Sequence, residues 1–258
     1  MPPTTIATPW HFPATNGLFD MSDLRNVVFV AALAGLLAGL VLTAMQIYAT
    51  VPLILQAETF EGAGGDHHGE AAVSEAEDGV EAWAPADGME RNLYTALAAI
   101  VTGVGFGLLL VAASELAGGI AGWRQGLVWG FAGFAVFTLA PGLGLPPELP
   151  AMPAADLVAR QIWWIATVAA TAAGLALIAF RASAVWAVVG VALIVAPHLI
   201  GAPQPVSHES PVPADLHHRF VVVVTVTNLV FWLVLGAAVG ALRPRFFGQA
   251  DNSRTSFA

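Results

Sequence analysis

Residues 26–48 read NVVFVAALAGLLAGLVLTAMQIY and contain no charged side chain. A helix of about 20 apolar residues crosses the hydrocarbon core of a bilayer, which is roughly 30 Å thick. The apolar residues here form one block and are not dispersed at the spacing of a soluble amphipathic helix. Residues 26–48 therefore predict a membrane-spanning helix.

Further apolar runs continue this pattern along the chain. Of its 258 residues, 57% are apolar and 10% charged, against roughly a quarter charged in soluble domains. The other runs lie at 93–116, 123–141, 161–180, 184–200 and 220–242. We predict an all-α, polytopic membrane protein with about six transmembrane helices. Gly35-x3-Gly39 and Gly103-x3-Gly107 have the spacing that lets two helix backbones approach closely.

The composition excludes several classes of function. The chain has no Cys, so disulfides and thiolate metal sites are ruled out. All nine basic residues are Arg, which rules out a Gly-Lys phosphate loop and a Schiff-base lysine. The net charge of −9 argues against binding nucleic acid. No His-Glu-x2-His motif occurs, and we predict that the chain is not an enzyme.

The two ends of the chain differ from its apolar middle. Residues 1–24 contain four Pro and no apolar period, which predicts a disordered tail. Met21 directly precedes the first span, so translation could begin there. We expect a transmembrane domain over 25–242 and a cytoplasmic tail over 243–258.

The distribution of Arg predicts the orientation. The amino-terminal side, the second and fourth loops and the carboxyl tail carry Arg25, Arg124, Arg181, Arg243, Arg245 and Arg254. The other three loops carry only Arg91, Arg160 and Arg219. Because basic residues concentrate on the cytoplasmic side, we predict both termini in the cytoplasm and a multi-pass protein of the cell's inner (plasma) membrane.

With this orientation, six of the seven His fall on the outer face. The first outer loop, residues 56–91, holds ten acids and one Arg. At its middle, Asp66-His67-His68-Gly69-Glu70 offers imidazole and carboxylate to a borderline divalent cation such as Co, Ni or Zn. A solvated acidic loop that binds nothing is an equally good interpretation.

A second group of imidazoles lies near the outer ends of the last two spans. Asp215 and His218 are three residues apart and can share an ion, whereas adjacent helical residues point about 100° apart. An interfacial helix cap is the alternative to a ligand pair here. The predicted metal ligands are, in full, Asp66, His67, His68, Glu70, His198, His208, Asp215, His217 and His218.

The pattern Ala-Asp-x3-Arg precedes each even-numbered span, at 86–91, 155–160 and 214–219. Each odd-numbered span carries a Pro near its outer end, which would end or kink the helix. We predict three tandem hairpin repeats (25–116, 123–180 and 181–242) with a pseudo-threefold axis along the membrane normal. The Asp can cap its helix and pair with the Arg four residues on, or the Arg can pair with a carboxylate across the axis.

Four segments resemble the CbtA family, which is proposed to consist of cobalt-transporter subunits. They are residues 28–39, the run from Pro52 to Glu58, the stretch from Gly130 to Pro150, and Arg160-Gln161-x-Trp163-Trp164. The resemblance implies uptake of a divalent transition metal, with cobalt as the transported ion and no cofactor. It also implies a partner, CbtB, which is a small single-span protein with a His-rich segment.

Two functions remain open at this point. A metal permease accounts for the one-sided distribution of His and acids. A non-transporting scaffold or metal-capturing subunit for a small partner permease accounts for the same surface and for the few polar residues within the spans. Imidazole and carboxylate sites favour Ni, Cu or Zn at least as much as Co, so the residues alone do not choose the metal.

Overall fold

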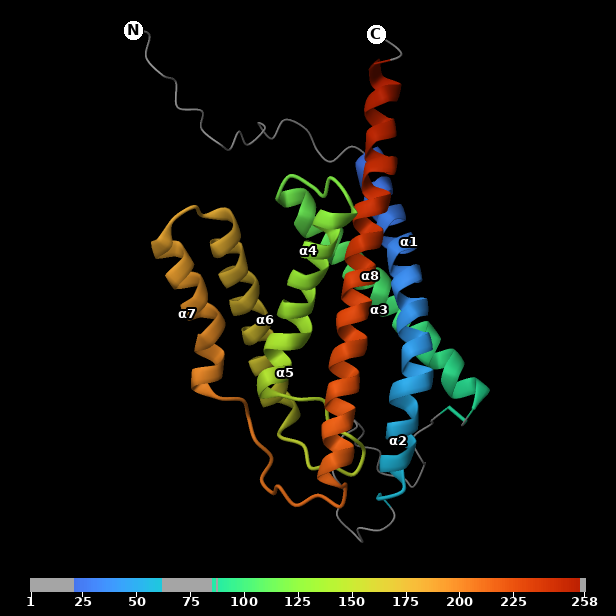
Figure 1. Cartoon of the computed structure of the whole chain (residues 1–258), viewed down its shortest axis with the longest axis vertical. Coiled ribbons are helices and arrows are strands. Elements are labelled where there is room, and N and C mark those ends of the chain that lie inside the picture. The colour runs from blue at the N-terminus through green and yellow to red at the C-terminus, as the bar shows by residue number, and fades with distance from the viewer. Residues whose placement is uncertain (1–20, 62–84, 87, 256–258) are drawn as a thin grey trace.

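The computed structural model describes residues 21–61, 85, 86 and 88–255, and this part of the chain is helical without strands (Figure 1). The elements in order are α1 (Met21–Met45), the π-helical turn η1 (Gln46–Thr50), α2 (Val51–Glu58), α3 (Met89–Leu116), α4 (Trp123–Phe134), the π-helical turn η2 (Ala135–Leu139), α5 (Ala140–Gly144), α6 (Leu157–Phe180), α7 (Ala184–Ile200) and α8 (Ala214–Thr255).

Within the described residues, five helical segments are long and apolar enough to cross a membrane. They are Leu24–Glu58, Met89–Leu116, Trp123–Gly144, Leu157–Phe180 and Ala214–Phe247. The helix α7 is also apolar, but its 17 residues give it a length of only about 25 Å at 1.5 Å per residue. The predicted multi-pass helical architecture is confirmed, with five such helices and a shorter sixth.

The first and third spans continue past the prolines that were expected to end or kink them. Pro52 and Pro141 each stand at the second position of a new helical segment that directly follows a π-helical turn. A Pro near the start of a segment needs no amide partner, and a π-helical turn absorbs one extra residue without ending the helix. The first span therefore runs to Glu58 and the third to Gly144.

The helices pack as a four-helix bundle with a helical pair at its side. The helix α1 packs against α3 and α8, and α8 also packs against α4. The helices α6 and α7 pack against each other and join the bundle through η2 and α5 (Figure 1). The predicted third hairpin would pair α7 with α8, but α7 packs mainly against α6. The threefold repeat and its axis therefore stay predictions.

Glycines set the distance between the helices of the bundle. A Cβ atom placed on Gly35 would lie 2.4 Å from the backbone nitrogen of Val104, and one on Gly107 would lie 2.9 Å from the carbonyl oxygen of Ala31. A Cβ on Gly126 would lie 2.1 Å from the carbonyl oxygen of Gly236. The predicted close approach of the first two spans is thus present, and α4 and α8 make a second contact of the same kind.

The two ends of the molecule differ. The C-terminal ends of α2, α5 and α7 lie at one end together with residues 145–156 and 201–213, and we name this the loop end (Figure 1). The start of α1 and the last turns of α8 lie at the opposite end, which we name the terminal end. The loop end is the one that the Arg distribution predicts to face outward.

The close contact between α1 and α3 generates a stability prediction. Gly35→Ala pushes a methyl group into the backbone of α3, and such overpacking costs about 1–3 kcal/mol. Gly105→Ala is the matched control, because Gly105 is exposed on the same helix pair and a Cβ there meets nothing within 4 Å. We expect a lower thermal unfolding midpoint in detergent for Gly35→Ala only. Equal midpoints for the two variants would contradict the packing.

The orientation can be tested with single cysteines, because the natural chain has none. Cys in place of Ser207 at the loop end should react with a membrane-impermeant thiol reagent on intact cells. Cys in place of Ser183, between α6 and α7 at the terminal end, should react only after permeabilisation. The opposite labelling pattern would invert the predicted topology.

Candidate functional site

The loop end contains a cleft of about 160 Å³ between the two loops and the first turn of α8. Its walls combine Pro-rich backbone with a few polar side chains. The lining residues are Gly144, Leu145, Pro146, Glu148, Met152, Pro153, Pro203, Gln204, Pro205, His208, Ser210 and His217. Two of the predicted metal ligands, His208 and His217, therefore line one cavity.

His217 is held by the opposite wall of the cleft. Its side chain is half-buried, and Nε2 lies 3.1 Å from the carbonyl oxygen of Pro147. The neutral tautomer that donates from Nε2 to this carbonyl leaves a lone pair on Nδ1. A metal-binding imidazole is commonly oriented in this way by a hydrogen bond from its other nitrogen.

The other two ionisable groups of the cleft, His208 and Glu148, differ in exposure and in ion pairing. His208 is exposed on the loop between α7 and α8. Glu148 is held by Arg160, with 3.1 Å between Oε2 and Nη2. Sequence analysis did not select Glu148 as a ligand candidate, because only the fold of residues 145–156 brings it to the same cavity as the two imidazoles.

The remaining predicted ligands lie apart from the cleft or outside the described residues. His198 packs edge-on against the Trp163 indole, with 5.8 Å between ring centroids. Asp215 and His218 are exposed on the first turns of α8. The predicted ligands of the acidic loop lie outside the described residues, and these are Asp66, His67, His68 and Glu70.

The cleft is not a preformed metal centre. Among the residues that the structure describes, no three His, Asp or Glu side chains are close enough to hold one ion. Binding of a cation by His208, His217 and Glu148 together would therefore require the walls of the cleft to move closer.

The Asp-x3-Arg pattern has a different structural role from the predicted pairing. Asp156 caps α6, and its Oδ1 accepts a hydrogen bond from the backbone nitrogen of Ala159 at 2.8 Å. Arg160 pairs with Glu148 and not with Asp156. The capping half of the prediction is thus correct in this repeat, and the predicted i to i+4 ion pair is wrong.

The first repeat shows the same alternative pairing. Arg91 at the start of α3 pairs with Glu58 at the end of α2, with 3.0 Å between Nη1 and Oε1. Its pattern partner, Asp87, lies outside the described residues. In both repeats, an Arg at the start of one helix thus binds a carboxylate at the end of the preceding span or just after it.

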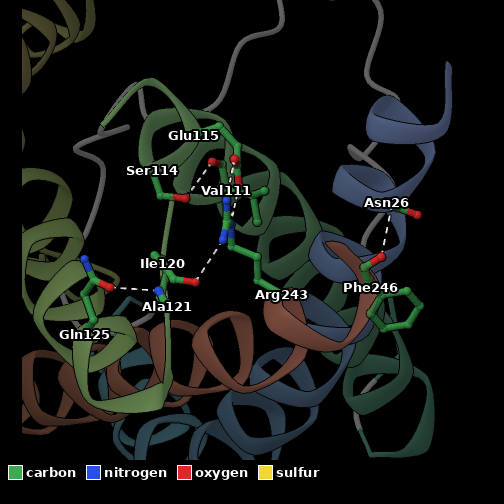
Figure 2. Close-up of polar contacts among 9 residues, drawn as sticks. All are labelled: Asn26, Val111, Ser114, Glu115, Ile120, Ala121, Gln125, Arg243 and Phe246. Carbon is green, nitrogen blue, oxygen red and sulfur yellow. Dashed lines mark hydrogen bonds and ion pairs between the residues drawn. The ribbon is translucent and has the colours of Figure 1, made fainter. Parts of the chain in front are cut away.

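The terminal end is closed by an ion pair that sequence analysis missed (Figure 2). Arg243 of α8 reaches the carboxylate of Glu115 at the end of α3 with two nitrogens, and the contact between Nη2 and Oε2 is 2.8 Å. Its Nη1 donates to the carbonyl oxygen of Ile120 at 3.2 Å. Gly119 has a φ of +81°, and a Cβ there would meet the Arg243 guanidinium.

A second polar contact joins the first and last helices at this end. The Asn26 amide nitrogen donates to the carbonyl oxygen of Phe246 at 3.3 Å (Figure 2). Neither contact can be predicted from spacing in the sequence, because Glu115 and Arg243 are separated by 128 residues and Asn26 and Phe246 by 220. Together the two contacts tie α1, α3 and α8 at the terminal end.

Fold and site together define a polytopic α-helical membrane protein whose terminal end is tied by polar contacts and whose loop end contains an imidazole-lined cleft. Comparison with family models then identifies the family. Residues 24–243 match the model of CbtA, described as a probable cobalt transporter subunit, and the chain belongs to this family. No curated protein matches the chain. No solved structure matches it either.

The ion pair at the terminal end generates a stability prediction. Breaking a buried pair by removing one partner costs about 3–5 kcal/mol, and the Arg243 and Glu115 side chains are 19% and 26% exposed. We therefore expect Arg243→Gln to lower the free energy of unfolding by about 2–3 kcal/mol. The neighbouring exposed Arg245→Gln is the control and should change it little.

The double variant Glu115→Gln/Arg243→Gln should lose less stability than the sum of its single variants, because neither charge is then left without its partner. Chemical denaturation of the purified proteins measures the free energy of unfolding of the wild type, the two single variants and the double variant. Additive losses would show that the two side chains do not interact.

Proposed function

We propose that this chain is the membrane subunit of an uptake transporter for divalent transition metals, with cobalt as the transported ion. The observation that carries the proposal is the cleft at the loop end, where His208, His217 and Glu148 line one cavity in a member of a family described as a probable cobalt transporter subunit. Imidazole nitrogen and carboxylate oxygen are suitable ligands for Co²⁺ and its neighbours.

Capture in the proposed mechanism begins at the acidic loop. Its Asp66, His67, His68 and Glu70 concentrate cations at the outer surface through charge and imidazole. The ion then passes to the cleft, where Glu148 exchanges its contact with Arg160 for the metal. The exposed His218 and Asp215 on the first turns of α8 contribute to the delivery in this proposal.

The proposed partner is a small single-span protein with a His-rich segment, similar to CbtB. The support for a partner is that the family is described as a subunit. In this proposal the complex lies in the cell's inner membrane, with both termini of this chain in the cytoplasm. The chain itself performs no catalysis, and the metal is its cargo.

A second function is favoured by the interior of the bundle. The buried polar side chains of the described spans are hydroxyls and one amide, namely Asn26, Thr43, Thr50, Ser114, Thr167, Thr171 and Thr227. An ionisable path through the membrane is the usual mark of proton or ion coupling, and this set contains no ionisable group. A scaffold that captures metal for a small permease therefore remains the alternative.

The decisive experiment measures uptake of labelled Co, Ni and Zn by cells that contain this chain alone, the small partner alone, or both. We expect metal-dependent uptake only where this chain is present. Full uptake with the partner alone would establish the scaffold function. No metal-dependent uptake in any combination would exclude transport.

The cleft is tested within the same assay. His208→Ala/His217→Ala should reduce uptake at low metal concentration at least tenfold, because two of its imidazole ligands are lost. Glu209→Gln is the matched control, because Glu209 is an exposed carboxylate beside His208 that does not line the cleft. Equal uptake by both variants would place metal capture elsewhere.

A further inference from the structure

Thr50 differs from most other buried hydroxyls of the spans. Its side chain is 7% exposed, and its Oγ1 has no hydrogen-bond partner. By comparison, Thr43 donates to the carbonyl oxygen of Gly39 at 2.8 Å, and Thr167 donates to that of Trp163 at 2.8 Å. A buried hydroxyl without a partner is costly, so its presence calls for a ligand or a water molecule.

The backbone around Thr50 also offers an oxygen. Thr50 ends the π-helical turn η1, in which the amide of Val51 bonds the carbonyl oxygen of Gln46. The next residue, Pro52, has no amide hydrogen, so one carbonyl within residues 47–49 lacks its usual donor. Single π-helical turns of this kind often occur at functional sites.

The helix that packs against η1 is α8. These antiparallel helices are joined near the terminal end by the contact between Asn26 and Phe246. Counting twenty residues from this contact toward the loop end reaches Gln46 on the first span and Val226 on α8. Val226 directly precedes Thr227 and Asn228. Gln46 therefore lies at the depth of Thr227 and Asn228, and the same count places Thr50 opposite Val222, about 7.5 Å closer to the loop end.

The polar groups of α8 present oxygen at this depth. Thr227 Oγ1 and Asn228 Nδ2 both donate to the carbonyl oxygen of Val224, each at 2.9 Å. The hydroxyl hydrogen of Thr227 and one amide hydrogen of Asn228 are thereby used, and the lone pairs of the hydroxyl oxygen and of the amide oxygen remain available. With Thr50 and the freed carbonyl of η1, the two helices contribute only neutral oxygen ligands.

We propose that η1 and α8 form an intramembrane site for a partly hydrated divalent cation, with Thr50, Gln46, Thr227 and Asn228 supplying oxygen. This inference rests on the proposed transport function and adds a position inside the membrane to it. Thr227 lies ten residues from His217 along α8, which places the site about 15 Å inward of the cleft.

The chemistry of the site suits passage and not storage. Hydroxyl, amide and carbonyl oxygens are hard ligands, and a divalent cation bound by a few of them retains several waters. Without a carboxylate the binding is weak, and conduction requires that an ion can leave the site again. The imidazoles of the cleft select the metal, and the oxygen site transmits it.

The test compares two buried hydroxyls that both lack partners. Thr50→Val removes the hydroxyl and nearly preserves the shape. Thr171→Val does the same at a residue that is 2% exposed, likewise unpartnered, and located on α6. Both variants should keep the wild-type unfolding midpoint or raise it, because no hydrogen bond is lost. We expect Thr50→Val to reduce the rate of labelled Co²⁺ uptake at least fivefold and Thr171→Val to leave it unchanged.

Two further variants keep the test decisive. Thr50→Ser retains the hydroxyl and should restore most of the uptake. Asn228→Leu removes the amide oxygen from α8 and should also reduce the uptake rate. It replaces Thr50→Val in the test if Thr50→Val fails to accumulate in the membrane. Wild-type uptake rates in Thr50→Val, or in Asn228→Leu where only that variant accumulates, would overturn the inference and show that Thr50 holds a water molecule at most.

The uptake measurements distinguish a failure of the transport function from a failure of the intramembrane site. If wild-type cells show no metal-dependent uptake with or without the small partner, the transport function itself is wrong. If the wild type transports and Thr50→Val transports equally well, the function stands and the intramembrane site is wrong.

Discussion

The contact of glycine backbones is the constraint on which the structure depends. In lipid the hydrophobic effect does not hold helices together, and close van der Waals packing must do so. Gly35 of α1 packs against the backbone of α3, and Gly126 of α4 packs against Gly236 of α8, at distances that no larger residue permits. Because α8 also packs against α1, these contacts fix α8, which carries His217 at the loop end and Arg243 at the terminal end.

The polarity of the bundle changes along the membrane normal. The loop end has a polar cleft, whereas an aromatic layer fills the bundle interior, with 4.8 Å between the ring centroids of Phe106 and Trp232 and 5.6 Å between those of Phe137 and Trp232. Trp232 follows Asn228 by one helical turn, so this layer lies between the proposed oxygen site and the terminal end. Under the proposed function, a transported ion requires the aromatic layer and the Arg243–Glu115 contact to open, which is the alternation expected when one part of a transporter rocks against another.

Hydropathy predicts the spans because the bilayer imposes their length, and the starts of α4 and α7 at Trp123 and Ala184 agree with the prediction. The π-helical turns escape it, because they change one backbone hydrogen bond and leave hydropathy unchanged. Of the cleft residues, His208 and His217 were identified from residue type alone. Glu148 of the cleft and Thr50 of η1 were not identified, because a carboxylate near a proline run and a threonine in an apolar helix gain their significance only from what packs against them.

The Arg residues of the repeat pattern also explain which wall of the cleft is free. An Arg in the first turn of a helix opposes the helix dipole. Arg91 offsets this with Glu58 at the end of the first span, and Arg160 does so with Glu148, which follows the third span. Arg219, in the third position, is exposed and has no such pair in the part of the chain that the structure describes. The loop over residues 201–213 therefore lacks the tie that holds residues 145–156. Because the loop without this ion pair carries His208, it is, under the proposed function, the wall whose movement completes a ligand set around a metal bound by His217.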